Sequence, residues 1–203
     1  MEFTSANASV VRSIKQRVLL NAWLRAARRR APLPVLADFR PDGIADELPD
    51  MMGYDVMDDG CGARFVITQE GSRLSATYGN DADQTNRYLD EAIGADRYAR
   101  VAPSYLACVA NKRPTYSVST VQDADGKSVS YERLLLPFGK AEAVEQIVGS
   151  FKAISIEGGF KVNNLLGLKS QRVPVTVINA VIDLDFVAAA GCTRAGDDVI
   201  ELG

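Results

Sequence analysis

The middle of the chain alternates apolar and polar positions in short runs, which predicts β-strands joined by turns. Residues 115–121 and 128–136 are rich in Thr, Val, Tyr and Leu, and Asp125-Gly126 lies between them. Asp-Gly is typical of a two-residue type I′ hairpin turn, because both central residues of that turn need positive φ. A third run of the same kind follows at 144–156. Three sequential antiparallel strands are therefore predicted, with the second ending at the proline that follows it.

Upstream of this hairpin the pattern predicts two more strands, at 54–57 and 63–69, and then helices. The helices are expected at 72–79, 84–93 and 97–111, the last with apolar residues at helical spacing. The resulting order is strand, strand, helices, strand, strand, strand. This order predicts an α+β fold, with a five-stranded antiparallel sheet and helices over one face.

The N-terminal segment predicts an amphipathic helix over 5–30, capped by Ser5, Asn7 or Ser9. Its apolar residues recur at three- and four-residue steps and include Trp23. This apolar stripe is wider than one small sheet requires. The sequence therefore predicts a homodimer with residues 9–30 in its interface.

The C-terminal segment contains a second β-rich run, at 173–184, with seven β-branched residues. Pro174 suits the start of a strand or a sheet edge rather than a sheet centre. We therefore expect an added strand here, paired with an edge of the sheet.

The central stretch also resembles a known family. Five short stretches resemble a bacterial family of stand-alone PAS domains. In chain order they are Ser-Arg-Leu-Ser-Ala-Thr-Tyr-Gly, Tyr-Leu-Asp-Glu-Ala, Arg-Pro-Thr-Tyr, Asp-Ala-Asp-Gly-Lys-Ser-Val-Ser-Tyr-Glu-Arg-Leu-Leu-Leu-Pro-Phe and Ile-Val-Gly-Ser-Phe. The resemblance covers roughly residues 10–157. It implies an N-terminal basic amphipathic helix (1–34), a PAS-like sensor domain (35–157) and a C-terminal extension (158–203). PAS domains share a shape rather than a chemistry, so the ligand stays open.

Charge is unevenly distributed along the chain. The 203 residues carry a net charge of −3, but residues 1–30 hold seven basic residues against Glu2, a net of +6, which leaves −9 for the remainder. We interpret Arg28-Arg29-Arg30 as a solvated last helical turn, where cations suit the helix dipole. An acidic partner surface or nucleic acid are the alternatives, and the acidic remainder disfavours nucleic acid. The acidic stretch 38–50 offers local charge pairing for the same helix.

Several kinds of chemistry are excluded or disfavoured. The chain has no histidine, which excludes a Ser-His-Asp triad, a Cys-His dyad and histidine-ligated haem. Three separated cysteines, Cys61, Cys108 and Cys192, indicate neither a disulfide framework nor a zinc site. Asp123 and Asp125 resemble the start of a calcium loop, but a hairpin turn explains them. We expect no catalytic residue and no metal, and the cofactor is unknown.

A ligand site is instead expected between the sheet and its helices. Its candidates are residues that could place a polar tip inside an apolar shell. They are Arg64, Tyr105, Tyr116, Tyr131 and Arg133. Tyr131 and Arg133 share one face of their strand with Glu132 on the other, but the pattern does not say which face looks inward.

The leading hypothesis is a regulatory or sensor protein that binds a small molecule, a protein partner, or both, and signals in trans. The alternative is a small α+β enzyme that uses a Tyr and an Asp for proton transfer, although no such constellation is visible. No signal peptide and no run of about 18 apolar residues occurs. We expect a cytoplasmic protein that does not enter a membrane.

Overall fold

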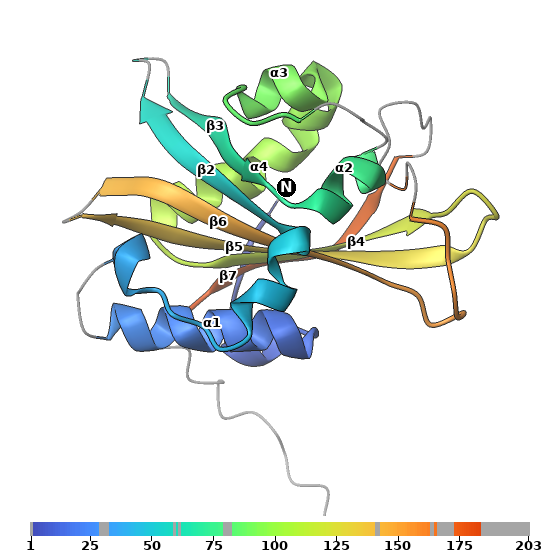
Figure 1. The fold of residues 1–203 in the computed structure, drawn as a ribbon, viewed down its shortest axis with the longest axis horizontal. Coiled ribbons are helices and arrows are strands. Elements are labelled where there is room, and N and C mark those ends of the chain that lie inside the picture. Colours follow the sequence, from blue (N-terminus) through green and yellow to red (C-terminus); the bar gives the residue numbers. More distant parts are fainter. Residues whose placement is uncertain are drawn as a thin grey trace, which may run out of the picture.

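The computed structural model describes residues 2–28, 33–58, 60, 62–78, 83–140, 143–162, 165 and 173–183. These residues form one mixed α/β unit built on a single sheet (Figure 1). Its strands are β1 (Thr4–Ala6), β2 (Met51–Asp58), β3 (Ala63–Glu70), β4 (Thr115–Gln122), β5 (Ser128–Lys140), β6 (Ala143–Ile154) and β7 (Val175–Ile182). Its helices are α1 (Ile14–Ala27), α2 (Ser72–Tyr78), α3 (Leu89–Ile93) and α4 (Ala95–Asn111).

The strands lie in the order β1-β7-β4-β5-β6-β2-β3. All neighbouring pairs are antiparallel except β1 and β7, which are parallel. The five strands expected from the sequence are present as β2 to β6, but the expected strand number is corrected to seven in the described chain. β7 adds to the free side of β4, and β1 then pairs with the second half of β7.

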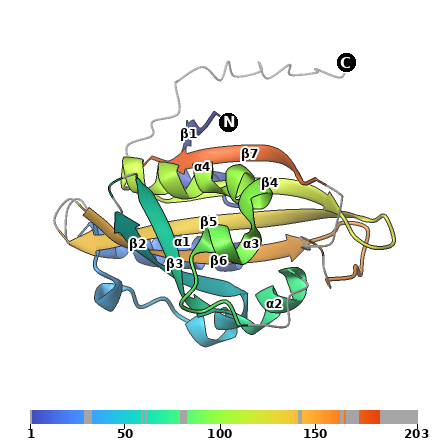
Figure 2. The same cartoon turned by 90° about the horizontal axis from the view of Figure 1, so that it is seen from above.

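Helices cover both faces of the sheet. α2, α3 and α4 lie on one face and α1 crosses the other, as Figure 2 shows with α4 in front of the sheet and α1 behind it. The expectation that helices cover one face is therefore incomplete. β5 lies between the two layers, and Leu134, Leu135 and Leu136 are all fully buried although they alternate between the faces.

The N-terminal helix begins later than the sequence predicts. Residues 4–6 form β1, and Asn7 caps only a short 3₁₀ turn, by accepting from the Ser9 amide at 2.8 Å. α1 starts after Ser13, whose hydroxyl accepts from the Gln16 amide. The amphipathic pattern does not mark this boundary, because a strand at the N-terminus depends on β7, far along the chain.

Two further expectations need correction. Residues 84–88 do not belong to the helix expected at 84–93. They run beside β3 instead, where the Asn86 amide donates to the Ile67 carbonyl and the Ile67 amide donates to the Arg87 carbonyl. β5 also continues past Pro137. The first residue of β4, Thr115, pairs with Leu135, so Pro137 lies beyond β4 and has only β6 beside it, where a missing N–H is tolerated.

The β4–β5 turn is longer than the Asp-Gly signal predicts. Gln122 pairs with Ser128, which leaves a five-residue loop over 123–127, and of its residues only Gly126 has positive φ. The buried Asp123 side chain stabilises this longer loop by accepting hydrogen bonds from backbone amides. Its Oδ1 accepts from the Asp125 and Lys127 amides at 2.9 Å each, and its Oδ2 accepts from the Lys161 amide at 2.9 Å. Asp123 thus ties the hairpin loop to the segment that follows β6.

We expect Asp123→Asn to loosen this connection. An asparagine has one acceptor oxygen, so it can serve the hairpin amides or the Lys161 amide but not both sides. The Lys161 amide should exchange with solvent at least about tenfold faster than in the wild type, and the melting temperature should fall. Hydrogen exchange measures the first effect, and Ser119→Ala, in the same hairpin, is the control. Unchanged protection of Lys161 would contradict the role of Asp123.

Candidate functional site

An aromatic cluster lies between the sheet and α4. We define it as Tyr54 of β2, Phe65 of β3, Tyr105 of α4, Tyr131 of β5 and Phe151 of β6. All five side chains are buried. The Tyr105 hydroxyl donates to the Tyr54 hydroxyl at 2.8 Å, and their rings meet edge to face with centroids 5.1 Å apart. The Phe65 ring also lies 5.1 Å from the Tyr105 ring, in a tilted arrangement.

Arg133 completes this site from β5. Its guanidinium carbon lies 5.9 Å from the ring centres of both Tyr105 and Phe151, which is within the range of a cation–π contact. Phe151 pairs with Arg133 across the β5–β6 ladder, and its ring lies 6.1 Å from Tyr131. The structure thus brings together three of the five candidates, Tyr105, Tyr131 and Arg133.

Tyr116 lies on the opposite face, under α1. Its hydroxyl accepts from the Arg12 amide at 3.2 Å and is hydrogen-bonded to the Glu132 carboxylate. Burial raises the pKa of Tyr116, and the Glu132 charge raises it further. Tyr116 therefore stays protonated and helps to hold the start of α1 on the sheet.

Arg64 lies away from the aromatic cluster as well, beside α3. Its guanidinium donates to Asp90 at 2.9 Å, approaches Glu91 at 3.3 Å, and lies 3.7 Å from the centre of the Tyr88 ring. Asp90 and Glu91 belong to α3, so Arg64 fixes that helix against β3. Among the described residues, the guanidinium has its ion pairs and ring contact with Asp90, Glu91 and Tyr88 and not with the aromatic cluster.

The sequence reasoning missed Tyr54, Phe65 and Phe151 as members of the site. Tyr54 and Phe65 lie in strands that were predicted, and Phe151 lies in the predicted run at 144–156. The available signal was cross-strand pairing: an antiparallel register that places Arg133 opposite Phe151 puts both on one face.

Cys108 of α4 is also on this face, with its thiol donating to the Leu135 carbonyl at 3.8 Å. Burial raises the pKa of Cys108, so the thiol stays neutral, and its hydrogen-bonding to Thr115 only partly opposes this. Cys61 and Cys192 lie outside the described residues. Within the described residues no group of three or more Cys, His, Asp or Glu is placed to hold a metal ion.

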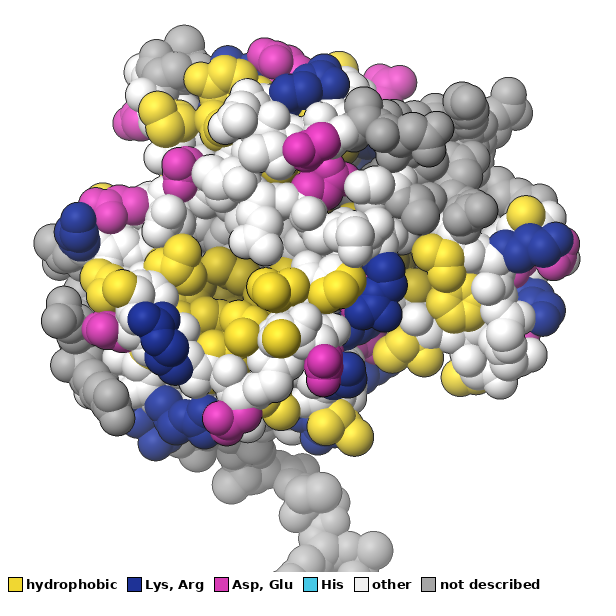
Figure 3. Space-filling model, in the orientation of Figure 1, with side chains coloured by type: hydrophobic (Ala, Val, Ile, Leu, Met, Phe, Trp, Pro, Cys, Tyr) yellow, Lys and Arg dark blue, Asp and Glu magenta, His cyan; other side chains and the backbone are white. Residues whose placement is uncertain are grey.

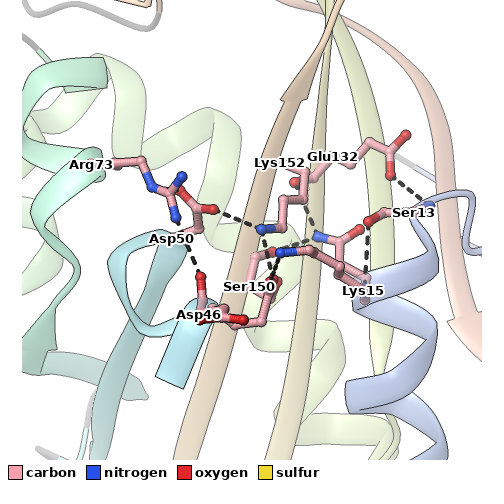
Figure 4. Close-up of polar contacts among 10 residues, drawn as sticks. Ser13, Lys15, Asp46, Asp50, Arg73, Glu132, Ser150 and Lys152 are labelled. Atoms are coloured by element: carbon pink, nitrogen blue, oxygen red, sulfur yellow. Dashed lines mark hydrogen bonds and ion pairs between the residues drawn. The ribbon is translucent and has the colours of Figure 1, made fainter. Parts of the chain in front are cut away.

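A chain of alternating charges runs from α1, on the other face of the sheet, to α2 (Figure 4). We call Lys15, Glu47, Asp50, Arg73 and Lys152 the ionic chain. Lys152 lies 2.6 Å from Glu47 and 2.7 Å from Asp50, Lys15 lies 2.7 Å from the second Glu47 oxygen, and Arg73 lies 3.0 Å from the second Asp50 oxygen. Burial raises the pKa of Glu47, but hydrogen bonds from Lys15 and Lys152 outweigh it, and the net pKa lies below its ordinary value. The ionic chain joins α1 to α2 through η4 (Leu48–Asp50) and β6.

The first turn of α1 is attached beside this ionic chain. The Ser13 amide donates to the Glu132 carboxylate at 3.3 Å, and the Gln16 side chain donates to the Ser150 carbonyl at 2.9 Å (Figure 4). Glu132 comes between Tyr131 and Arg133 in the sequence. One stretch of β5 therefore contacts the aromatic cluster with two side chains and the start of α1 with the third.

A comparison with models of known protein families found no match, and a search of curated proteins also found none. None of the helices in the described residues is long and apolar enough to cross a membrane.

Proposed function

We propose that the protein is a PAS-type regulatory protein that binds a small molecule at the aromatic cluster and acts on a protein partner. The observation that carries the proposal is the convergence of Tyr105, Tyr131 and Arg133 on one face of the sheet. This face is covered by the helices that lie between β3 and β4 in the sequence. The order β2, β3, α2 to α4, β4, β5, β6 is the one that the PAS resemblance implies.

The chemistry of the aromatic cluster suggests the class of ligand. Aromatic walls bind planar or apolar groups, and a guanidinium beside them binds a carboxylate or another anion through paired hydrogen bonds. Arg133 is half-buried, so it can exchange its present contacts for those of a ligand. We propose a small organic anion, with an apolar or aromatic body, as the ligand.

A ligand at this site has a direct route to α1. A ligand that displaces the β5 backbone at Tyr131 or Arg133 would also displace Glu132 between them, whose side chain accepts from the Ser13 amide at the start of α1. The hydrogen bond from Gln16 to Ser150 fixes the same helix turn to β6. Binding on one face would therefore change how α1 sits on the other, and a partner that contacts α1 would sense the change.

Native mass spectrometry of the purified protein tests the ligand. We expect a co-purifying organic anion, or stabilisation by members of a panel of aromatic and aliphatic carboxylates, and at least about tenfold weaker binding in Arg133→Gln. Arg64→Gln is the matched control, because Arg64 was an equal candidate from the sequence but lies beside α3. Circular dichroism establishes that both variants fold. Equal binding by both variants, or no binding by the wild type, would contradict the proposal.

The enzyme alternative receives little support from the described residues. The buried acid and tyrosine that lie together are Glu132 and Tyr116, and α1 covers them. The raised pKa of Tyr116 keeps its proton in place, whereas proton abstraction at neutral pH needs a group whose pKa is close to that pH. Both groups are already used to hold the start of α1.

A further inference from the structure

The inward face of α1 is buried against the protein's own sheet. Leu19, Leu20 and Trp23 are at most 1% exposed, and the Trp23 indole donates to the Pro137 carbonyl at 2.7 Å. This burial accounts for the wide apolar stripe that the sequence assigned to a dimer interface. Whatever partner α1 has must therefore meet its outward face.

The outward face of α1 combines arginines with two exposed apolar side chains. We call it the arginine face, and it consists of Ile14, Arg17, Val18, Asn21, Arg25 and Arg28. Ile14 is 72% exposed and Val18 is 37% exposed, one helical turn apart. The remaining members are exposed too, and no Asp or Glu occurs anywhere over 3–37. Figure 3 shows Lys and Arg side chains along the lower edge of the molecule, where Figure 1 places α1, with some Asp and Glu side chains among them.

Within the described residues, no carboxylate forms an ion pair with an arginine of this face. Glu47 and Asp50, from the acidic stretch next in sequence, bind Lys15, Lys152 and Arg73 instead. Arg17 donates to the Arg12 carbonyl, which leaves most of its hydrogen-bond donors available. As far as the structure describes the chain, the arginine face is thus a basic surface without ion pairs, on a protein of net negative charge.

We infer that the arginine face docks an acidic amphipathic helix of a partner protein. Ile14 and Val18 match the i and i+4 anchors with which helices pack side by side, and Arg17, Arg25 and Arg28 can form paired hydrogen bonds with carboxylates. This supplies the partner chemistry of the proposed function and rests on that function for its biological role. The surface itself is present whether or not the aromatic cluster holds a ligand.

Three other occupants fit the arginine face less well. A symmetric contact between two copies would oppose Arg17, Arg25 and Arg28 with their own copies, and like charges repel. A membrane surface needs a broad apolar face, and that face of α1 is buried on the sheet. Duplex nucleic acid would leave Ile14 and Val18 without apolar contacts, and residues 31–203 carry −9.

Fluorescence anisotropy with a defined probe tests the inference. The probe is a labelled, helix-forming peptide of Ala and Glu that carries two Leu four positions apart. Its control has the same composition, with the two Leu two positions apart, so that they cannot share one helix face. We expect the full-length protein to bind the probe and to bind the control peptide at least about tenfold more weakly. Arg17→Gln/Arg25→Gln should weaken probe binding at least about tenfold, and Ile14→Ser about fivefold.

Arg100→Gln, an exposed arginine of α4 on the other side of the sheet, should leave probe binding unchanged. Circular dichroism of each variant excludes unfolding as the cause of a loss. Equal binding of both peptides, a loss of equal size in Arg100→Gln, or no binding at all would overturn the inference. So would tighter binding of duplex DNA or phosphatidylserine vesicles, or dimerisation in light scattering that Arg17→Gln/Arg25→Gln abolishes. Absence of a ligand at the aromatic cluster would refute the proposed function without changing these results.

Discussion

Replacing Trp23 by alanine is expected to lower the free energy of unfolding by about 3–5 kcal/mol. Trp23 is the only tryptophan and is fully buried between α1 and the sheet. Its removal would leave a large cavity, and the Pro137 carbonyl would lose the indole donor that lies 2.7 Å away. Because fluorescence would lose its reporter, urea unfolding of the variant has to be followed by far-ultraviolet circular dichroism.

Two further variants separate the contributions of Trp23. Trp23→Phe keeps most of the apolar volume but removes the indole N–H, so its cost should be smaller, about 1–3 kcal/mol. Val18→Ala, on the outward side of the same helix, should change stability by less than about 1 kcal/mol. A wild-type-like stability of Trp23→Ala would mean that α1 does not pack on the sheet. The apolar stripe of the helix would then again support the homodimer predicted from the sequence. That homodimer otherwise stays a prediction.

The strands of the sheet core could be predicted because their signals are local. Alternation and turn residues located β2, β3, β4 and β6 to within a few residues. The same reasoning found the strand at 173–184, observed as β7, from its β-branched residues. It could not find β1, because three residues at the N-terminus become a strand only by pairing with Ala180, Val181 and Ile182.

Local signals also misplaced the turn and two helix starts. The Asp125-Gly126 pair suggested a two-residue turn, but the carboxylate of Asp123 stabilises a longer loop by accepting three backbone amides. The start of α1 is set by Ser13 and its neighbour Glu132 on β5, a contact between distant segments. Competing tertiary contacts of this kind leave little trace in the pattern of apolar positions.

The candidate site was predictable in part for a similar reason. The pattern placed Tyr131 and Arg133 on one face of a strand, but the sheet is covered on both faces, so polarity alone could not identify the face of Tyr116. In the observed register Tyr116 pairs with Leu134 and therefore points toward α1. Arg64 lies near the edge of the sheet, where Asp90 of α3 is within reach.

The ionic chain shows how much charge patterning could predict. The acidic stretch 38–50 offered local charge pairing for the N-terminal helix, and Arg29 and Arg30 at the end of that helix lie outside the described residues. The structure pairs Glu47 with Lys15 at the start of α1, and also with Lys152 from β6. Lys152 is about 100 residues away from Asp50, its second partner, so no local pattern could have indicated it.

Replacing Lys152 by methionine is the second change for which we expect a large effect, a loss of about 3 kcal/mol in the free energy of unfolding. Lys152 is the cation shared by Glu47 and Asp50, and its side chain is 14% exposed. Methionine would leave two carboxylates close together, with only Lys15 and Arg73 at their outer sides. Urea unfolding measures the loss. Lys161→Met is the matched control, because its ion pair with Asp125 is exposed and should contribute much less.

The pH dependence of stability tests the same arrangement independently. The folded-state pKa of Glu47 lies below its ordinary value of 4.5, so its stabilising contribution is present above that pH and is lost as the pH falls through the folded-state pKa. Lys152→Met should raise this pKa, so that acid unfolding begins at a higher pH than in the wild type. Glu47→Gln/Lys152→Met should be more stable than Lys152→Met alone, because it removes the carboxylate that the single variant leaves without its buried cation. An acid transition at the same pH in Lys152→Met and the wild type would contradict the role of Lys152 in holding Glu47, and with it the link from α1 to α2 through η4 and β6.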